Sequence, residues 1–543
     1  MAPDTVEPIQ SPSALVIVEF GGRSVSAVLC DVVAGRHRIV SSAEAWQIPP
    51  DQGALNAAGR ALRGLEASSG RRLLSDQGAV SPMTHDGVGC DLMVVSGGGP
   101  LRALVVLLGK VAPSILDAVE PAVADLIPLG SVEEAIEERR GLVGRIASSL
   151  RGDRPDVLLV VGGAELATGQ ATSALAGTLT TVHTCCPGGL PIVVLAAPPA
   201  VRERVVADLR LRMRRALDAI PPVRQTEPEG LAEQLRVIWR EKHAAAPIWR
   251  ALTSGEEIHP LPRLESIGTA CQTLSRSKGA PVWAIEVGDA DVAVWRATPE
   301  RFDLARRPIA QLTLGRESGD LDEWPRRPWL AEVDRPSIER QRERSVQAIA
   351  EVADGLRDLA RAEPRPALVV GRGVGLVHRL PATDAAVALG LGIGLTGPAP
   401  VALDRHQILA GAGVLLERYR DAGVDLIRDG LDDLGMLVIG RTVELEGARL
   451  QIDAGSKGVK APSDVHPGEV TALSSLEWTH AEISLNPSRS VDIGYGDGRR
   501  GLVSLGECEI GAVLTLTADR GTRRWAKASG APGRLGGILR RSP

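Results

Sequence analysis

Two glutamates, Glu19 and Glu286, each end a strongly apolar stretch and are each followed by a glycine turn and a second apolar stretch. The turns read EFGGRS at Glu19–Ser24 and EVGDAD at Glu286–Asp291. In a strand–glycine–strand hairpin, backbone N–H groups can hold phosphate oxygens while a carboxylate at the strand end holds a metal-bound water. Glycine permits the close approach that a side chain would bar. The pattern indicates metal-assisted phosphate binding, although a glycine-rich hairpin turn is more often structural.

A third glycine loop, GRGVG at Gly371–Gly375, follows the apolar strand predicted at 367–370 and lies about 80 residues beyond the second hairpin. Taken singly, each turn is a weak signal. Their order is the informative feature, because two similar hairpins open two halves of the chain and a strand-glycine loop follows in the second half.

The segments that position these turns predict an α/β fold. Strands that are apolar throughout, such as VLLVVGG at 157–163 and the run at 191–195, alternate with helices, which is typical of a parallel or mixed sheet covered on both faces. One helix is expected to open at Ser131, where Ser131 and Glu134 form an S-x-x-E capping box. Beyond about residue 436, short alternating runs separated by Gly, Asp, Asn and Pro predict β structure.

The composition excludes several classes of partner. Sixty-two Lys and Arg stand against sixty-seven Asp and Glu, with the two signs mixed, so no face that tracks nucleic-acid phosphates is predicted. No aromatic residue lies between Trp46 and Trp239, so that stretch offers no platform for base stacking or for binding a quaternary ammonium group. Most of the tryptophans lie between Trp239 and Trp329, where we expect any distinctive contact surface.

The six cysteines show no C-x-x-C pair and no histidine at zinc spacing, so reduced, buried thiols are expected. Adjacent Cys185 and Cys186, with His183 just upstream, leave a thiol or metal site as the less favoured alternative. The N-terminus lacks the basic and apolar regions of a signal peptide, and no apolar run reaches about 18 residues. We therefore expect a cytoplasmic protein with no membrane span.

The two hairpins and the loop resemble those of the acetate and sugar kinase, heat-shock and actin superfamily, and within it the MutL-like glutamate mutase accessory family. EFGGR resembles the family's D-x-G-S-T hairpin, EVGDADVA its D-x-G-G-A-T-T-D hairpin, and GRGVG its adenosine-type G-T-G-G loop. PDVLLVVGG at 155–163, ESGDL at 317–321 and DRHQILAGAGVL at 404–415 are similar to further family segments. DIGYGDG at 492–498 and ADRG at 518–521 are similar to the C-terminal extension of long members, so the resemblance covers most of the chain.

This resemblance implies an α/β fold with two RNase H-like halves, of the actin and sugar-kinase type, and a C-terminal β-rich domain. The boundaries it predicts are a disordered N-terminus at 1–13, a first half at 14–227, a second half with a helical lead-in at 228–435, a β-rich domain at 436–525 and a basic tail at 526–543.

The resemblance also implies an ATP and Mg²⁺ site between the halves. Glu19 and Glu286 are the implied metal-side carboxylates and the candidate catalytic groups. The implied nucleotide-binding positions are Glu19, Gly21, Gly22 and Ser24 in the first hairpin, Glu286, Gly288 and Asp289 in the second, and Gly371, Gly373 and Gly375 in the adenosine loop.

Several positions depart from the family pattern. Both metal-side Asp residues are Glu here, one methylene longer. The hydroxyl residues of the first hairpin become Gly22 and Arg23, and the T-T-D positions of the second become DVA at 291–293. Lost hydroxyl donors and a lost carboxylate weaken phosphoryl transfer, while Asp289 and Asp291 would place negative charge where phosphate should bind. We therefore predict a degenerate site in which ATP and Mg²⁺ binding is weakened or lost.

The favoured interpretation is an accessory or chaperone-like protein that resembles the reactivating component of cobalamin-dependent glutamate (methylaspartate) mutase. It would act by binding a protein partner, with such a mutase as the candidate, and would have a weak or lost ATPase. Nucleotide would close the cleft between the halves and shift a partner-binding surface.

Two alternatives stay open. One is an active ATPase or small-molecule kinase, in which Glu19 or Glu286 orients the attacking group through Mg²⁺ and Arg23 binds phosphate. The other is a protein that binds a different anionic ligand without turnover.

Three further polar residues have structural interpretations. Asp404 precedes a predicted helix, so helix capping is the favoured role for its carboxylate. His37 and His378 flank strands beside arginines and are expected at the surface rather than in a catalytic site.

Overall fold

The computed structural model describes residues 12–518 of the 543-residue chain, apart from a set of internal segments. The segments outside this description are 23, 47–52, 76–77, 118, 120–122, 138–140, 153, 164–168, 187–188, 217–221, 246–251, 253–260, 289–290, 310–311, 313–334, 357–364, 443–446, 455–463, 468–469, 474–481, 494–498 and 505–510.

Contacts divide the chain into two compact units. Unit 1 consists of Met1–Gly97, Ala251–Ile258 and Ser266–Pro543, and unit 2 of Gly98–Arg250 and His259–Glu265. The first half expected at 14–227 therefore contributes to both units.

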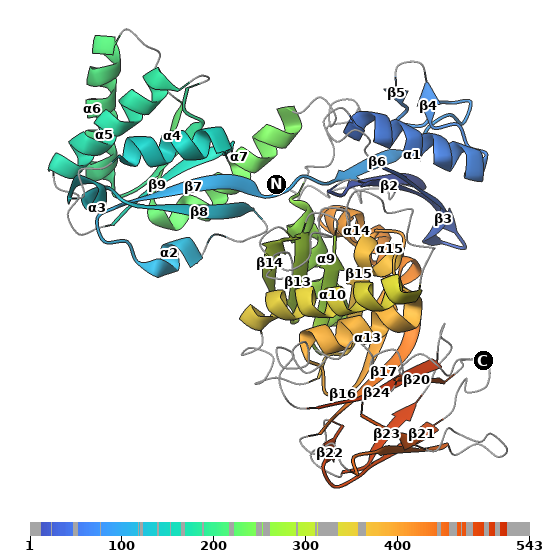
Figure 1. Cartoon of the computed structure of the whole chain (residues 1–543). Coiled ribbons are helices and arrows are strands. Elements are labelled where there is room, and N and C mark those ends of the chain that lie inside the picture. The colour runs from blue at the N-terminus through green and yellow to red at the C-terminus, as the bar shows by residue number, and fades with distance from the viewer. Residues whose placement is uncertain are drawn as a thin grey trace, which may run out of the picture. The chain divides into compact units, whose positions relative to one another are not determined.

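The first sheet of unit 1 has the strand order β3-β2-β1-β6, and its strands β2, β3 and β6 are labelled in Figure 1. Strand β1 (Ala14–Phe20) runs antiparallel to β2 (Ser24–Val33), which pairs in turn with β3 (Arg36–Trp46). Strand β6 (Leu92–Ser96) is parallel to β1. The predicted N-terminal hairpin is thus confirmed. Helix α1 (Gly53–Ser69) packs against β2 and β3.

The second sheet of unit 1 repeats this arrangement and extends it. Its first five strands lie in the order β14 (Phe302–Pro308), β13 (Asp291–Ala297), β12 (Val282–Val287), β15 (Leu368–Arg372) and β16 (Gly397–Leu403). The first three are antiparallel, and the next two join in parallel. When the strands of each sheet are numbered in chain order, these five strands have the order 3-2-1-4-5, and the four strands of the first sheet have the order 3-2-1-4. The repeated order confirms the predicted α/β class with two RNase H-like halves.

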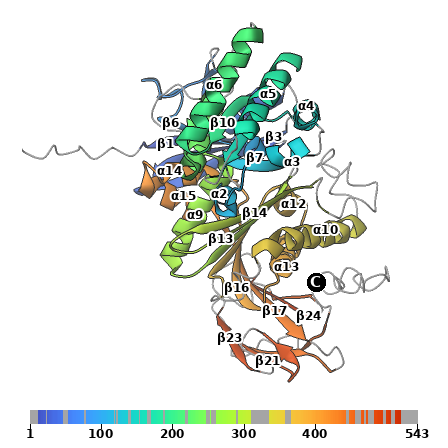
Figure 2. The same ribbon diagram turned by 90° about the vertical axis from the view of Figure 1, so that its left-hand side faces the viewer.

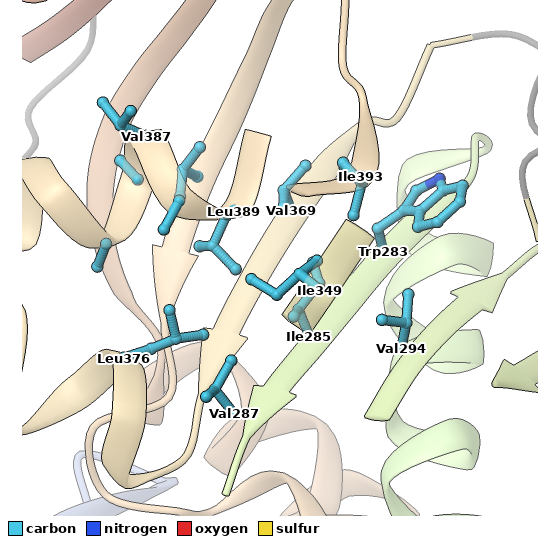
Figure 3. Packing of buried hydrophobic residues seen from close by; sticks show 14 of the residues in the cluster. Trp283, Ile285, Val287, Val294, Ile349, Val369, Leu376, Val387, Leu389 and Ile393 are labelled. Atoms are coloured by element: carbon cyan, nitrogen blue, oxygen red, sulfur yellow. The ribbon is translucent and has the colours of Figure 1, made fainter. Parts of the chain in front are cut away.

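Two long helices cover one face of the second sheet. Helices α10 (Arg335–Ala353) and α13 (Ala382–Ile393) pack against each other and over β13, β15 and the strand that follows β16. The short helix α12 (Val374–Val377) begins directly after β15. Figure 3 shows the aliphatic core between these layers. Its labelled side chains are Trp283, Ile285, Val287, Val294, Ile349, Val369, Leu376, Val387, Leu389 and Ile393.

Helices α14 (Leu409–Leu415) and α15 (Arg420–Gly430) follow β16 in sequence but pack on the first sheet, against β1, β6 and β3. Close approach explains the glycines of α14. A Cβ on Gly411 would lie 2.2 Å from Cγ2 of Ile17 in β1. A Cβ on Gly413 would lie 1.9 Å from the carbonyl oxygen of Ser266 in α9 (Arg263–Lys278).

The C-terminal β-rich region continues the second sheet. Strand β17 (Asp432–Thr442) pairs with β16, and β24 (Gly511–Ala518) pairs in parallel with β17. The outer strands are β20 (Val470–Leu473) on β24 and β22 (Val491–Asp492) on β17. A separate four-stranded sheet consists of β19 (Asp464–Val465), β18 (Leu450–Ala454), β21 (Glu482–Pro487) and β23 (Gly501–Ser504). Residues of the small sheet share one hydrophobic core with Val438 and Leu514 of the large sheet.

Unit 2 is built on a five-stranded parallel sheet with the order β11-β10-β9-β7-β8. Its strands are β7 (Leu101–Leu108), β8 (Ala124–Ser131), β9 (Val157–Gly162), β10 (Ile192–Ala196) and β11 (Val223–Thr226). Numbered within the unit, this is the doubly wound order 2-1-3-4-5.

Helices cover both faces of the unit 2 sheet, as its apolar strands predict. Helices α5 (Gly169–Cys185) and α6 (Pro199–Ala216) lie side by side in both views (Figure 2). The other helices of the unit are α2 (Pro113–Asp117), α3 (Val132–Glu137), α4 (Leu142–Gly152) and α7 (Leu231–Ala245).

The predicted capping box is confirmed at the start of α3. The backbone N–H of Glu134 donates to Oγ of Ser131 (3.0 Å), and the N–H of Ser131 donates to Oε2 of Glu134 (3.2 Å). The remaining short elements are β4 (Leu74–Ser75), β5 (Gly78–Ala79) and the 3₁₀ turns at Pro228–Gly230 and Asp354–Leu356.

Candidate functional site

The two glycine hairpins make the same backbone turn. The N–H of Gly21 donates to the carbonyl oxygen of Ser24, and the N–H of Gly288 donates to that of Asp291, each at 2.9 Å. In both hairpins a glutamate lies two residues before the glycine and is the next-to-last residue of an interior strand of its sheet. The sequence similarity of the hairpins therefore reflects a repeated structure.

The neighbours of the two glutamates show where the repeat differs. Glu19 lies opposite Ser96 on the parallel strand β6, and Glu286 lies opposite Arg372 on the parallel strand β15. The second half thus carries an arginine where the first half carries a serine. Paired residues in a parallel sheet point to the same face, so the Arg372 side chain projects on the same side as Glu286.

Arg372 is the centre of a buried polar cluster. Its Nη2 donates to Oε1 of Glu19 at 2.5 Å, and its Nε lies 3.1 Å from Oε2 of Glu286. Its Nη1 lies 3.3 Å from Oδ2 of Asp404, and Nη2 also donates to Oε1 of Gln407 at 2.9 Å. The side chains of Arg372 and Asp404 are 0% exposed, and those of Glu19 and Glu286 are 4% and 6% exposed. One guanidinium group therefore joins both hairpin carboxylates and a third carboxyl group.

The glycines of the GRGVG loop let the chain around Arg372 pack closely. A Cβ on Gly373, whose φ is +84°, would lie 2.7 Å from the carbonyl oxygen of Val287 at the end of β12. A Cβ on Gly375 would lie 2.5 Å from Cγ1 of Val287, and one on Gly371 would lie 2.7 Å from Leu389. These contacts account for glycine at all three positions without a ligand.

Asp404 both pairs with Arg372 and caps the following helix. Its carboxylate accepts hydrogen bonds from the backbone N–H groups of Ile408 (2.7 Å) and Leu409 (3.2 Å). The N-cap position of α14 is Ile408, so the carboxylate of Asp404 holds the first N–H groups of the helix, as predicted, from four residues before that position. Burial raises the pKa of the Asp404 carboxyl, because loss of hydration outweighs the opposing effects of Arg372 and the two N–H groups. Gln407 is held at φ +56°, a left-handed conformation that is uncommon outside glycine.

The second hairpin also carries a local ion pair. Oδ2 of Asp291 lies 2.5 Å from Nε of Arg306 in β14, and the side chain of each is 12% exposed. The negative charge that Asp291 brings to the hairpin is therefore compensated within the second sheet. Asp289 and Arg23 lie outside the described residues.

The residues present do not fit a Mg²⁺ ion while Arg372 lies where it does. The carboxylates of Glu19 and Glu286 contact one guanidinium group, and a second cation between them would be repelled by it. Among the described residues, no group of three or more His, Cys, Asp or Glu side chains is arranged to hold a metal ion.

The described cysteines are free thiols. Burial raises the pKa of Cys90 and of Cys271 to about 12, so both stay protonated at neutral pH. Cys185 is exposed and Cys186 half-buried, whereas Nδ1 of His183 accepts a hydrogen bond from the N–H of Leu190 at 3.1 Å. Cys508 and the segments ESGDL, most of DIGYGDG and most of ADRG lie outside the described residues.

Two expectations from composition are wrong at particular residues. Trp239, Trp283 and Trp295 are buried in cores, at 0%, 5% and 0% exposure, so these three side chains form no contact surface. The other tryptophans of this stretch, Trp249, Trp324 and Trp329, lie outside the described residues. His37 is also buried, and its Nε2 lies 2.8 Å from the carbonyl oxygen of Pro12. The alternation of β3 places it on the covered face of the strand.

The sequence pattern predicts the glycines of the GRGVG loop as site residues but neither Arg372 nor Gln407. A signal for Arg372 exists: a charged residue directly follows four apolar or glycine positions of a strand that is buried throughout. A buried arginine needs carboxylate partners, so such a residue predicts an ion-pair cluster. Among the described residues no helix is long and apolar enough to cross a membrane.

No model of a protein family matches the sequence, and no curated protein matches it. Among solved structures, the chain is similar to a nucleotide-free acetone carboxylase, with 12% identity, a TM-score of 0.34 and coverage of 74% of this chain and 70% of that one. It is similar to a Ppx/GppA family member from Aquifex aeolicus, with 10% identity, a TM-score of 0.19 and coverage of 77% and 88%. It is also similar to acetate kinase from Porphyromonas gingivalis, with 9% identity, a TM-score of 0.24 and coverage of 75% and 100%. At these TM-scores the likenesses add nothing to the strand order, on which the fold assignment rests.

Proposed function

We propose that this protein is an accessory protein of actin-like fold that binds a protein partner and does not turn over ATP. The observation that carries the proposal is the contact of both hairpin carboxylates, Glu19 and Glu286, with the guanidinium group of Arg372. Phosphoryl transfer in such a fold depends on a metal ion that neutralises phosphate charge. An arginine that already contacts both carboxylates competes with that ion for the same ligands.

The hairpins themselves support the same conclusion. Where the resemblance expects hydroxyl donors in the second hairpin, Asp291 is ion-paired with Arg306. A carboxylate at this position repels phosphate and offers no proton to it. The chain has therefore kept the hairpin backbone while the side chains that serve phosphate have changed.

The class of partner comes from the resemblance to the MutL-like accessory family, which implies a cobalamin-dependent carbon-skeleton mutase. In this proposal the protein binds the mutase and either releases damaged cofactor or holds the mutase competent. The shared segments, from PDVLLVVGG to DRHQILAGAGVL, are the basis for that choice.

The test has two arms on the same purified chain. Calorimetric titration with ATP and Mg²⁺, together with an assay of phosphate release, is expected to show no turnover. Turnover that is lost in Glu286→Ala and kept in Glu300→Ala, an exposed control, would establish the alternative of an active ATPase or kinase. In the second arm, the chain is mixed with a cobalamin-dependent mutase carrying hydroxocobalamin. Complex formation with release of the corrinoid, followed by its absorbance, supports the proposal, and absence of any complex contradicts it.

A further inference from the structure

Arg372 links two sheets that are separate in the strand topology. It extends from β15 in the second sheet, whereas Glu19 ends β1 in the first sheet, 353 residues away in sequence. Glu286 contacts the same guanidinium group from the second sheet. The ends of the two hairpins are therefore joined through one positive charge.

The oxygen groups at this junction are of the kind that binds cations, but with the guanidinium between them the described residues are not arranged to hold a metal ion. Carboxylates from two hairpins and a carboxyl group from the loop after β16 surround the charge, and the amide oxygen of Gln407 adds a further acceptor. Oxygen ligands of this kind suit a hard divalent cation. A guanidinium group presents several donors in a fixed fork and stays charged at any working pH, so it can satisfy such ligands without exchange.

We infer that the Arg372 guanidinium is a covalently attached substitute for a divalent cation and joins the two hairpins without metal or nucleotide. The inference rests on the proposed function, since it describes the same site in a protein that does not turn over ATP. The two sheets are then joined permanently and independently of Mg²⁺. Once the arginine is removed, the site accepts a divalent cation.

The charges around Arg372 explain why a divalent cation is expected to bind when the arginine is removed. Three carboxyl groups, those of Glu19, Glu286 and Asp404, contact the same positive group, and all four side chains are buried. Without the guanidinium, these buried carboxyl groups would lose the positive charge that they share, which is costly. A bound cation is the direct remedy.

The equivalence of Arg372 and Ser96 suggests the test substitution. Arg372→Ser gives the second half the residue that the first half carries, and it supplies a hydroxyl oxygen. The matched control is Arg342→Ser. Arg342 is also a buried arginine of unit 1, but within the described residues its ion pair is with one carboxylate, that of Asp384, at 2.6 Å.

Melting temperatures are measured on the full chain in a chelating buffer and in millimolar Mg²⁺, without nucleotide or partner. The expected result is no Mg²⁺ effect on the wild type or on Arg342→Ser, and a rise of several degrees for Arg372→Ser. Adding Glu19→Gln to Arg372→Ser should abolish the rise, because it removes one charged ligand. Calorimetry with MgCl₂ should show binding to Arg372→Ser alone. Millimolar methylguanidinium should also stabilise Arg372→Ser.

A wild type that Mg²⁺ stabilises, or a folded Arg372→Ser that responds to neither cation, would overturn the inference. If Arg372→Ser does not fold under any condition, the inference is tested by deuterium exchange on the Glu19→Gln variant. That substitution weakens the contact between the sheets and leaves Arg372 paired with Glu286 and Asp404. Faster deuterium exchange at the ends of β1 and β2 supports the inference, and unchanged exchange overturns it. Failure of the proposed function appears as ATP turnover or as no partner complex, neither of which enters these measurements.

Discussion

A single side chain changes what the repeated hairpins can do. Glu19 and Glu286 occupy equivalent places, yet the residue opposite the first is Ser96 and the residue opposite the second is Arg372. A buried guanidinium group stabilises only when its partners are well placed, and removing one partner of such a cluster typically costs about 3–5 kcal/mol. Loss of one partner of the cluster is therefore expected to destabilise unit 1.

Gly411 gives a prediction about close packing. Its missing side chain lets α14 approach β1, so Gly411→Ala is expected to lower the free energy of unfolding by about 1–3 kcal/mol through overpacking against Ile17. The matched control is Gly59→Ala in α1, where a Cβ meets nothing within 4 Å. That change should be neutral or stabilising by up to about 1 kcal/mol, because alanine is the better helix former.

Urea unfolding followed by circular dichroism measures both glycine variants. If the two substitutions shift the transition midpoint in the same direction and to the same extent, the packing role of Gly411 is wrong.

Helix α15 and strand β3 show how an exposed sheet edge is completed by side chains. Outer N–H groups of β3 would otherwise lack partners and invite pairing with another chain. Instead, the N–H of His37 donates to Oδ2 of Asp425 (3.2 Å), and the N–H of Ile39 donates to Oδ2 of Asp429 (2.7 Å). Arg38 also pairs with Asp429. Asp425 and Asp429, one helical turn apart, thus accept hydrogen bonds from the N–H groups of two strand residues that are two positions apart.

Asp429→Ala should remove this edge contact. The expected cost is about 1–2 kcal/mol, because the Ile39 N–H loses a charged acceptor. Deuterium exchange at Ile39 should accelerate most. Asp421→Ala, on an exposed position of the same helix, is the control and should leave exchange in β3 unchanged. Equal exchange rates at Ile39 in the two variants would show that Asp429 does not protect the edge.

Much of the element pattern could be predicted from the sequence because it depends on local periodicity. The hairpin at β1 and β2, the capping box at Ser131, and the apolar strands of unit 2 all follow from residue spacing and burial. The parallel pairing of β24 with β17 could not, because the strand sequence is compatible with many partners. Parallel pairing between distant strands is a property of the assembled sheet.

The candidate site was predictable to the same degree. The two hairpin glutamates could be named from their place at the ends of apolar strands. Their common partner could not, because Arg372 is far from Glu19 in sequence and the contact depends on how the sheets come together. A local motif identifies the backbone of such a site, while the side chains that complete it come from the tertiary fold.

The two sheets of unit 1 are also joined away from Arg372. Nε2 of His378, just after α12, lies 2.9 Å from Oε2 of Glu44 in β3, and Nδ1 of His406 lies 2.9 Å from Oγ of Ser42. His378 is 40% exposed, as its predicted surface position requires. These contacts join the outer strand of the first sheet to segments of the second half.

The Glu44–His378 contact predicts a pH dependence of stability. The hydrogen bond and the charge of Glu44 raise the pKa of His378, while burial and the charges of Arg405 and Arg379 oppose the rise. A histidine whose pKa is raised on folding contributes its full stabilisation below its unfolded pKa of about 6.5, and that contribution is lost as pH rises through the folded value. The difference in melting temperature between the wild type and Glu44→Gln should therefore be largest at about pH 5 and should shrink by about pH 8.

The wild type and Glu44→Gln contain the same histidines, so taking the difference between their melting temperatures removes the contributions of the other histidines. A difference that stays constant or grows with rising pH contradicts the assignment of the His378 shift to Glu44.

Because α14 and α15 pack on the first sheet, that sheet cannot be completed until these late helices have been synthesised. The last residue of β6 leaves the ribosome about 300 residues before α14 is made. Unit 2, with five consecutive strands, can be completed in that interval. Until α15 is made, the β1 surface that receives α14 and the outer edge of β3 lie uncovered on the nascent chain. Exposed strand edges and uncovered apolar surfaces are prone to aggregation, so we expect the N-terminal sheet to be vulnerable until α14 and α15 pack on it.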